Sequence, residues 1–273
     1  MFQKNIAGKT VLLKADCDFN FLNEFDNVFA VYDELTSGNI CFGAEKNGRK
    51  YFLKYAGAQP KNYIGKPEKA IERLTNAAGL YETFKHEALA NLVYTQEFPK
   101  GFLMVFDFIY SIPIGPLTLY KKQIHSLPLP IRLKMLDNVF DFFNSLSHRD
   151  YIAAGLSDSK FLFDIKKSTL KLSSINGFVK MPFQNTGRLQ GSSVYLAPEC
   201  YQNTMLDERV TVYSMGVLAM NVLGGALTGT DAKESLYYIA KKALYEDRAL
   251  RIQSTEKFLK SWRKAVLNIP FNL

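Results

Sequence analysis

The stretch ICFGAEKNGRKYFLKYA (residues 40–56) decides how the N-terminal part of the chain folds. Two strand-like runs flank Asn47-Gly48, and an Asn-Gly pair in that setting is a strong signal for a tight β-hairpin. A third strand-like run, VFAVYDEL (28–35), precedes the hairpin and is separated from it by the turn TSGN. We therefore predict an antiparallel meander over residues 28–56.

A helix is predicted directly after the meander. Within residues 65–84, Ile71, Leu74 and Tyr81 recur at helical spacing, and Pro67 suits the first helical turn. This segment should lay one apolar face on the sheet, because a surface helix buries the stripe that carries its apolar residues.

From about residue 111 onward the pattern becomes mainly helical. The segment 208–225 is apolar on nearly every side, as in a helix buried all round, and it ends in a glycine pair. The further elements expected are a strand at 101–109, helices at 130–148, 233–245 and 254–266, and short strands at 160–163 and 170–175. The sum is an α+β fold with a strand-rich part at 28–110 and a helical part at 111–273, preceded by an N-terminal extension of residues 1–27.

The composition is that of an ordinary globular protein, with 47% hydrophobic and 22% charged residues. No apolar run approaches the roughly 20 residues that a membrane span needs, and the N-terminus lacks the apolar segment of an export signal. The cysteines Cys17, Cys41 and Cys200 are odd in number and widely spaced, which fits reduced cytosolic thiols. The charged residues behind the net charge of +8 are scattered along the sequence, and no tight Lys/Arg cluster with interleaved aromatic residues appears, as a nucleic-acid-binding surface would require. We expect a cytoplasmic protein with neither a membrane nor a nucleic-acid partner.

Four segments, in order along the chain, resemble motifs of the protein-kinase superfamily, and the resemblance to that fold extends from about Phe29 to Val266. GRKYFLKYA (48–56) resembles the strand whose lysine, here Lys54, anchors phosphates. GSSVYLAPECY (191–201) resembles the end of an activation segment, and the buried helix at 208–225 resembles the central helix of the large lobe. EDRALRIQSTEKFLKSW (246–262) resembles the segment that carries a structural arginine. The closest resemblance is to small single-domain bacterial Ser/Thr-kinase-like proteins, and it implies a bilobal kinase-like fold.

The resemblance implies that Arg251 pairs with Glu199 of the Ala-Pro-Glu motif. Such a pair is architectural rather than catalytic, since it ties a loop to the helical lobe. Thr211 stands where many kinases place an aspartate that clamps the catalytic loop, so we expect that loop to be less firmly held. Ser192 and Ser193 are candidate phosphorylation sites, although the arginine that would bind such a phosphate is absent.

The tripeptide His148-Arg149-Asp150 looks like the catalytic motif of a kinase, but its spacing does not fit. With Asp150 as the base, the positions of the family's lysine and asparagine would fall on Ile152 and Gly155. Neither side chain supplies the ammonium group or the amide oxygen that the lysine and the asparagine of the family provide.

Counting back from the strand-like FLFD (161–164) gives a different alignment, which we favour. Gly155 then stands at the position of the catalytic base, Ser157 at that of the lysine and Lys160 at that of the metal-binding asparagine. In this alignment the tripeptide at 148–150 lies at the end of a helix.

The metal-binding carboxylate of the family also has no counterpart. Its position falls on Ser174 or, in a second alignment, on Ile175, and neither supplies the anionic oxygen that Mg²⁺ prefers. Asp158 and Asp164 are the nearest remaining carboxylates. They are weak candidates as replacement metal ligands, because acidic residues in such loops are more often turn residues.

Nucleotide-binding candidates remain in the strand-rich part. Lys54 is predicted either to bind an anion or nucleotide, or to form a structural pair with Glu72, with Glu82 as the other choice. Phe106 stands at the gatekeeper position, where it would narrow an adenine pocket.

The glycine-rich loop of the family is reduced to a single glycine. Its three positions fall on Asp33, Leu35 and Gly38, and a carboxylate at the first would repel a triphosphate.

The resemblance and these losses together predict a pseudokinase, a binding or regulatory module without phosphoryl transfer. ATP is the ligand that the resemblance implies, whereas the missing carboxylates argue against Mg²⁺. A protein partner is expected, and its identity does not follow from the sequence. The alternative is an atypical ATP-dependent Ser/Thr kinase or small-molecule phosphotransferase that recruits Asp158 and Asp164.

Overall fold

The computed structural model describes residues 1–35, 37–113, 118–186, 189, 191–224 and 231–269. It is a mixed α+β structure, as the sequence predicts. The chain divides into two compact units: unit 1 comprises Met1–Lys85 and Ala90–Ile109, and unit 2 comprises His86–Leu89 and Tyr110–Leu273.

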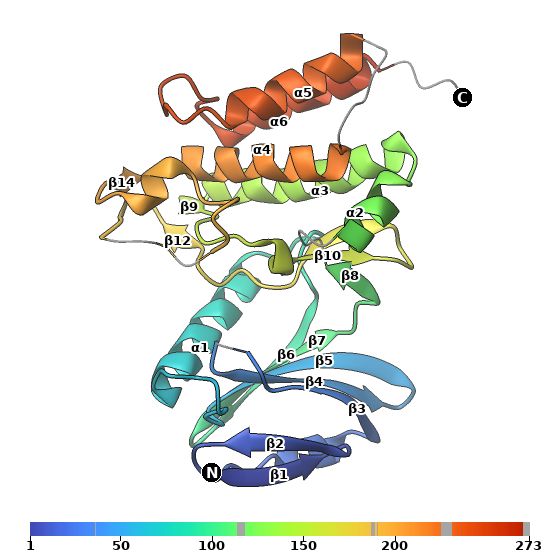
Figure 1. Cartoon of the computed structure of the whole chain (residues 1–273), viewed down its shortest axis with the longest axis vertical. Helices are drawn as coiled ribbons and strands as arrows, with labels where there is room; N and C mark the ends of the chain where they lie inside the picture. The colour runs from blue at the N-terminus through green and yellow to red at the C-terminus, as the bar shows by residue number, and fades with distance from the viewer. Residues whose placement is uncertain (36, 114–117, 187–188, 190, 225–230, 270–273) are drawn as a thin grey trace. The chain divides into compact units, whose positions relative to one another are not determined.

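Unit 1 is built on a five-stranded antiparallel sheet with the order β3-β4-β5-β7-β6, accompanied by the separate hairpin β1-β2 (Figure 1). Its elements are β1 (Phe2–Ile6), β2 (Lys9–Leu13), the 3₁₀ helix η1 (Asn20–Glu24), β3 (Asn27–Tyr32), β4 (Asn39–Lys46), β5 (Arg49–Ala56), α1 (Pro67–Thr83), β6 (Leu92–Phe98) and β7 (Gly101–Asp107).

The β4–β5 hairpin forms as predicted. Lys46 and Arg49 are paired across a two-residue turn, in which Asn47 and Gly48 have φ values of 53° and 72°. Two positive φ angles in succession are what a type I′ turn requires, and its twist matches that of the flanking strands. With the β3–β4 pairing, the predicted meander is confirmed.

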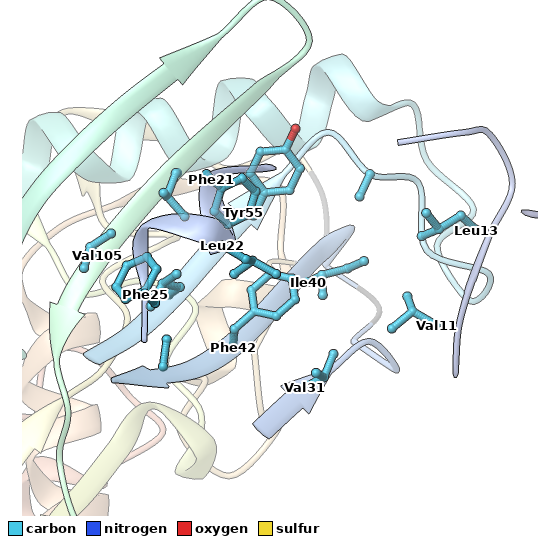
Figure 2. Packing of buried hydrophobic residues seen from close by; sticks show 14 residues of the cluster. Val11, Leu13, Phe21, Leu22, Phe25, Val31, Ile40, Phe42, Tyr55 and Val105 are labelled. Atoms are coloured by element: carbon cyan, nitrogen blue, oxygen red, sulfur yellow. The ribbon is translucent and has the colours of Figure 1, made fainter. Parts of the chain in front are cut away.

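One face of the sheet carries the apolar core of unit 1, shown in Figure 2. Alternate residues of β4 and β5 point to this face, since successive strand residues face opposite sides. The core also takes in residues from the first 27 positions of the chain, so the predicted extension is an integral part of unit 1. The core residues are Val11, Leu13, Phe21, Leu22, Phe25, Val31, Ile40, Phe42, Ala44, Leu53, Tyr55, Ala58, Leu103 and Val105.

The opposite face of the sheet carries Lys54. Lys54 is paired with Cys41 on β4 and with Met104 on β7, and α1 packs against β5 and β7. The face that α1 buries consists of Ala70, Leu74, Ala77, Ala78 and Tyr81.

Unit 2 is mainly helical, with short sheets. Its elements are β8 (Ser111–Pro113), α2 (Thr118–His125), α3 (Leu129–Ser147), β9 (Tyr151–Ile152), η2 (Asp158–Lys160), β10 (Phe161–Asp164), β11 (Thr169–Leu172), β12 (Val179–Lys180), β13 (Phe183–Gln184), η3 (Pro198–Tyr201), β14 (Met205–Leu206), α4 (Arg209–Leu223), α5 (Asp231–Ala243) and α6 (Thr255–Leu267). The strands form a β11-β10-β8 sheet and the pairs β9-β12 and β13-β14.

Helix α4 is buried along most of its length, as its all-round apolar sequence predicts. It contacts α2, α3, α5 and α6, and α3 lies alongside it in Figure 1. The helix ends at Gly224, whose φ is 74°. Buried Arg132 of α3 donates to the Leu223 carbonyl at 2.7 Å, which satisfies an acceptor that the helix end would otherwise leave unbonded.

Helix α6 is amphipathic and packs on α3 through aromatic side chains. Trp262 stacks on Phe258 with ring centroids 5.9 Å apart and meets Phe140 edge-on at 5.2 Å. The indole is fully buried, and its N–H has no acceptor among the described residues. No described helix has the length and apolar character required to cross a bilayer.

Candidate functional site

Two loops of unit 2 lie against each other at the place that the resemblance assigns to catalysis. One joins β9 to β10, the other joins β11 to β12, and the β9–β12 and β10–β11 pairings bring them together. The approach is close, because a Cβ added at Gly177 would lie 3.1 Å from the Ala154 carbonyl oxygen. Gly177 also has a φ of 90°, so only glycine fits this position without strain.

Lys160 links the two loops. Its Nζ donates a hydrogen bond to the Gly155 carbonyl at 2.8 Å and another to the Asn176 carbonyl. The Lys160 carbonyl in turn accepts from the backbone N–H of Ser173 at 2.8 Å. The residue at the expected metal-binding asparagine position therefore places a fixed positive charge among backbone oxygens.

Gly155, at the expected base position, is buried and has a φ of 72°. The chain at 191–192 packs over it: Ser192 donates its backbone N–H to the Leu156 carbonyl at 3.0 Å, and a Cβ at Gly191 would lie 2.8 Å from the same oxygen. Ser193, the other candidate phosphorylation site, is exposed.

Neither alignment of the metal-binding aspartate yields a ligand. Ser174 accepts a weak hydrogen bond from the backbone N–H of Asn176 at 3.4 Å through its hydroxyl. Ile175 is fully buried. The donor set near Lys160 thus consists of a hydroxyl and backbone carbonyls, which do not fit Mg²⁺.

The two remaining carboxylates both have structural roles. Asp164 is buried, and its Oδ1 accepts from the backbone N–H groups of Lys166 and Lys167 at 3.0 and 3.1 Å, which closes the β10–β11 turn. Burial raises the pKa of Asp158, and a hydrogen bond from the Tyr195 hydroxyl opposes that shift. Both groups are engaged by the protein itself.

Thr211 contacts the loop after β9. The fully buried Thr211 hydroxyl of α4 accepts from the Ala153 backbone N–H at 2.9 Å. A neutral hydroxyl thus satisfies one backbone N–H of this loop at the position where many kinases have an aspartate.

The His148-Arg149-Asp150 tripeptide lies where the favoured alignment puts it. Helix α3 ends at Ser147, and all three residues are exposed. Asp150 has a φ of 59°, and its carbonyl accepts from the Met181 N–H at 2.6 Å. Asp150 is therefore a turn residue after the helix.

Glu199 and Arg251 form a buried bidentate ion pair. The two guanidinium nitrogens lie 2.6 and 3.0 Å from the two carboxylate oxygens, with side-chain exposures of 3% and 0%. Arg251 also donates to the carbonyls of Arg209 and Tyr245. The pair and its backbone partners tie η3 to the start of α4 and to the segment before α6.

In unit 1, Lys54 lies among aromatic rings. Its Nζ is 5.1 Å from the centroid of Phe106 and 5.9 Å from that of Phe52. Burial lowers the pKa of Lys54, and the Cys41 thiol opposes that shift. The structure thus brings together two predicted site residues, Lys54 and buried Phe106, and Tyr81 of α1 packs on the same Phe106 ring at 5.2 Å.

The glutamates of α1 that were candidate partners of Lys54 are exposed. Glu72 is exposed and accepts from Lys69 at 2.8 Å, and that hydrogen bond lowers its pKa. Glu82 and Glu68, the other glutamates of α1, are also exposed. The preference for Glu72 as the partner of Lys54 is therefore not supported, because the face that α1 buries is apolar apart from Tyr81.

Gly38 has a role in packing. Its φ is 81°, and a Cβ there would lie 2.8 Å from the Tyr63 ring. Arg73 of α1 donates to the Tyr63 hydroxyl and to the Ser37 carbonyl, each at 2.9 Å. Asp33 is neutralised by Lys9 at 2.6 Å.

Sequence reasoning missed Phe29, which covers the Lys54 face of the sheet. Gly43 is paired with Phe52 and shares that face, and a Cβ at Gly43 would collide with the Phe29 ring. Phe29 also packs edge-on against Phe108 at 5.4 Å, and Lys50 lies 5.0 Å above its ring. The β-bulge between Val28 and Ala30 changes the direction in which this side chain points. An alternating pattern of strand residues gives no sign of a bulge, so the position of Phe29 could not be predicted from the sequence.

Among the residues that the structure describes, no three His, Cys, Asp or Glu side chains gather closely enough to hold a metal ion. In comparisons with known proteins, no family model matches this chain, and no curated protein is significantly similar to it.

Proposed function

We propose that the protein is a bilobal, protein-kinase-like pseudokinase that acts as a binding or regulatory module. The observation that carries this proposal is the position of Lys160, whose ammonium group bonds the carbonyls of Gly155 and Asn176. An ammonium ion at this place repels a divalent cation, and phosphoryl transfer depends on metal ions to neutralise the phosphates.

Two features of unit 1 support the same proposal. Phe29 lies over Gly43, which is paired with Phe52 on the face that carries Lys54, so an aromatic side chain covers part of the face on which the resemblance would place a nucleotide base. The carboxylate expected to orient Lys54 is exposed and bound by Lys69.

The alternative, an atypical phosphotransferase, depends on Asp158 and Asp164. Asp164 closes a turn with two backbone N–H groups, and Asp158 is hydrogen-bonded to Tyr195. Both carboxylates are thus already held as hydrogen-bond acceptors within the protein, and Asp164 is also buried, which disfavours the enzyme.

A thermal-shift titration with ATP, with and without Mg²⁺, tests the proposal. We expect no Mg²⁺-dependent stabilisation in the wild-type protein, and no transfer of labelled phosphate from ATP above the level of a Lys54→Ala variant. A metal-dependent shift that disappears in Lys54→Ala, together with phosphate transfer, would establish the enzyme instead.

A further inference from the structure

Unit 1 contains a cavity that the kinase-like assignment does not use. It has a volume of about 680 Å³ and is enclosed by the loop after β2, the end of β5, the first turns of α1 and the β6–β7 turn. That volume lies in the range of sites that take small molecules or single side chains, roughly 300 to 1,000 Å³. Every lining residue belongs to unit 1.

Aromatic rings form the floor of the cavity. Phe21, Tyr55 and Phe98 pack against one another with centroids 4.9, 5.6 and 5.9 Å apart, and Figure 2 shows the Tyr55 hydroxyl at the outer end of its ring. Ile71 and Pro67 of α1 add apolar wall. Such a floor favours an apolar group, and aromatic rings also tolerate a cation nearby.

Exposed charged side chains surround the opening. Asp16, Asp18, Glu68 and Lys100 line the cavity and are exposed. Asp16 is paired with Lys4 at 2.7 Å. Asp18 accepts from the neutral donors of Asn20, and Lys4 also acts on its charge from a greater distance. Three carboxylates, those of Asp16, Asp18 and Glu68, stand against the two lysines Lys4 and Lys100, so the opening carries a slight excess of negative charge in a protein whose net charge is +8.

We propose that this cavity binds a ligand in which an apolar ring or alkyl group is joined to a positive charge. The apolar part lies on Phe21, Tyr55 and Phe98, and the ammonium or guanidinium group lies at the opening near Asp18 and Glu68. This chemistry occurs in free aromatic amines and in protein segments where an aromatic residue adjoins Lys or Arg.

Three small probes of matched shape test the chemistry: phenethylamine, 2-phenylethanol and phenylacetate, measured by calorimetric titration at neutral pH. We expect the cation to bind more tightly than the neutral alcohol by roughly 5-fold, and the anion to bind most weakly, because an exposed ion pair contributes up to about that factor. Equal affinities, or tighter binding of the anion, would overturn the proposal.

A double variant and a control test whether Asp18 and Glu68 cause the preference for the cationic probe. Asp18→Asn combined with Glu68→Gln should lower the affinity for phenethylamine to that for 2-phenylethanol. Glu82→Gln is the matched control, because Glu82 is an exposed glutamate of the same helix that does not line the cavity. Loss of the charge preference in the control, or its survival in the double variant, would contradict the assignment.

Cys17 provides a direct reporter of where the ligand binds. It lines the cavity and is partly exposed, whereas Cys41 and Cys200 are buried. Saturating phenethylamine should slow the reaction of Cys17 with a thiol reagent by about 3-fold or more at about pH 8.5, where a thiol whose pKa burial raises still reacts. Ile71→Trp, which fills the cavity, should abolish both the binding and the protection. Unchanged labelling in the presence of bound amine would place the ligand elsewhere.

A blocked Phe-Lys dipeptide amide, compared with phenethylamine, separates the two sources of the ligand. Tighter binding of the dipeptide identifies a protein segment as the occupant, and tighter binding of the free amine identifies a small molecule. Failure of both to bind would overturn the inference and would leave the proposed function untouched, since neither rests on the other.

Discussion

The ammonium group of Lys160 holds two backbone carbonyls that lie in separate loops. A lysine that only lay on the surface would leave those loops free to move apart. Lys160 acts as an internal crosslink between the two loops, so its removal should lower the stability of the fold in addition to removing the charge that repels a divalent cation.

Lys160→Met should destabilise the protein by about 2 kcal/mol or more, because each hydrogen bond from a charged donor contributes roughly 1.5 to 3 kcal/mol. Chemical denaturation at neutral pH measures the change. Lys180→Met, at an exposed lysine of β12, should change the unfolding free energy by less than about 0.5 kcal/mol. Equal losses in the two variants would show that the crosslink is not formed.

Asp207 gives stability a dependence on pH. Burial alone would raise its pKa, but hydrogen bonds from Arg209 and Arg248 outweigh burial and bring the pKa down from 3.8 to about 2. Because the folded pKa is the lower one, the stabilisation is complete above about pH 5 and is lost as the pH falls towards 2.

Asp207→Asn should therefore cost about 1 kcal/mol at neutral pH, a figure reduced for the 37% exposure of the side chain. Its unfolding free energy should converge with that of the wild type as denaturation is repeated down to pH 2. A constant difference across this range would show that the charge of Asp207 is not what stabilises the fold.

At the level of elements, the sequence was informative where periodicity was strong. The β4–β5 hairpin and helices α1, α3, α4 and α6 follow from Asn47-Gly48 and from apolar spacing. The β1–β2 hairpin, β6 and α2 were missed. Strand β6 is an edge strand with an irregular burial pattern, so it shows no clean alternation.

The contacts of the candidate site, too, could be predicted only in part. The buried pair of Glu199 and Arg251 could be expected, because the resemblance names both partners. The contacts of Lys160, Thr211 and Phe29 could not be, since each depends on where a side chain points after distant segments have packed together.

Glycine at position 57 lets the end of β5 approach the β6–β7 turn. Its φ is 125°, and a Cβ there would collide with the Lys100 carbonyl. Gly57→Ala should therefore destabilise by about 3 kcal/mol, combining backbone strain with a clash that neither backbone can avoid.

Gly48→Ala is the matched control for Gly57→Ala, because Gly48 also has a positive φ, 72°, but has open space around it. It should cost only about 1 kcal/mol, the strain of a left-handed alanine. Thermal unfolding of both variants, compared with the wild type, separates the clash from the strain. Similar losses would mean that the β6–β7 turn moves away at little cost.

At the level of the whole molecule, buried charge supports the helical unit. The Glu199–Arg251 pair joins residues 52 positions apart in the sequence. Glu199→Gln keeps the shape of the side chain but leaves Arg251 buried without a counter-charge, so a loss of about 3 to 5 kcal/mol is expected. Denaturant titration measures it, and exposed Glu256→Gln should have little effect. A loss below about 1 kcal/mol would indicate that the pair is solvated.

Trp262 is the only tryptophan of the chain, and its burial against Phe258 and Phe140 has an optical consequence. An indole shielded from water, with no acceptor for its N–H among the described residues, should emit at short wavelength and resist quenching by iodide or acrylamide. Its emission reports on the helical unit alone, whereas the strand-rich unit is monitored only through tyrosine. Red-shifted, readily quenched emission from the native protein would contradict the packing of α6 on α3.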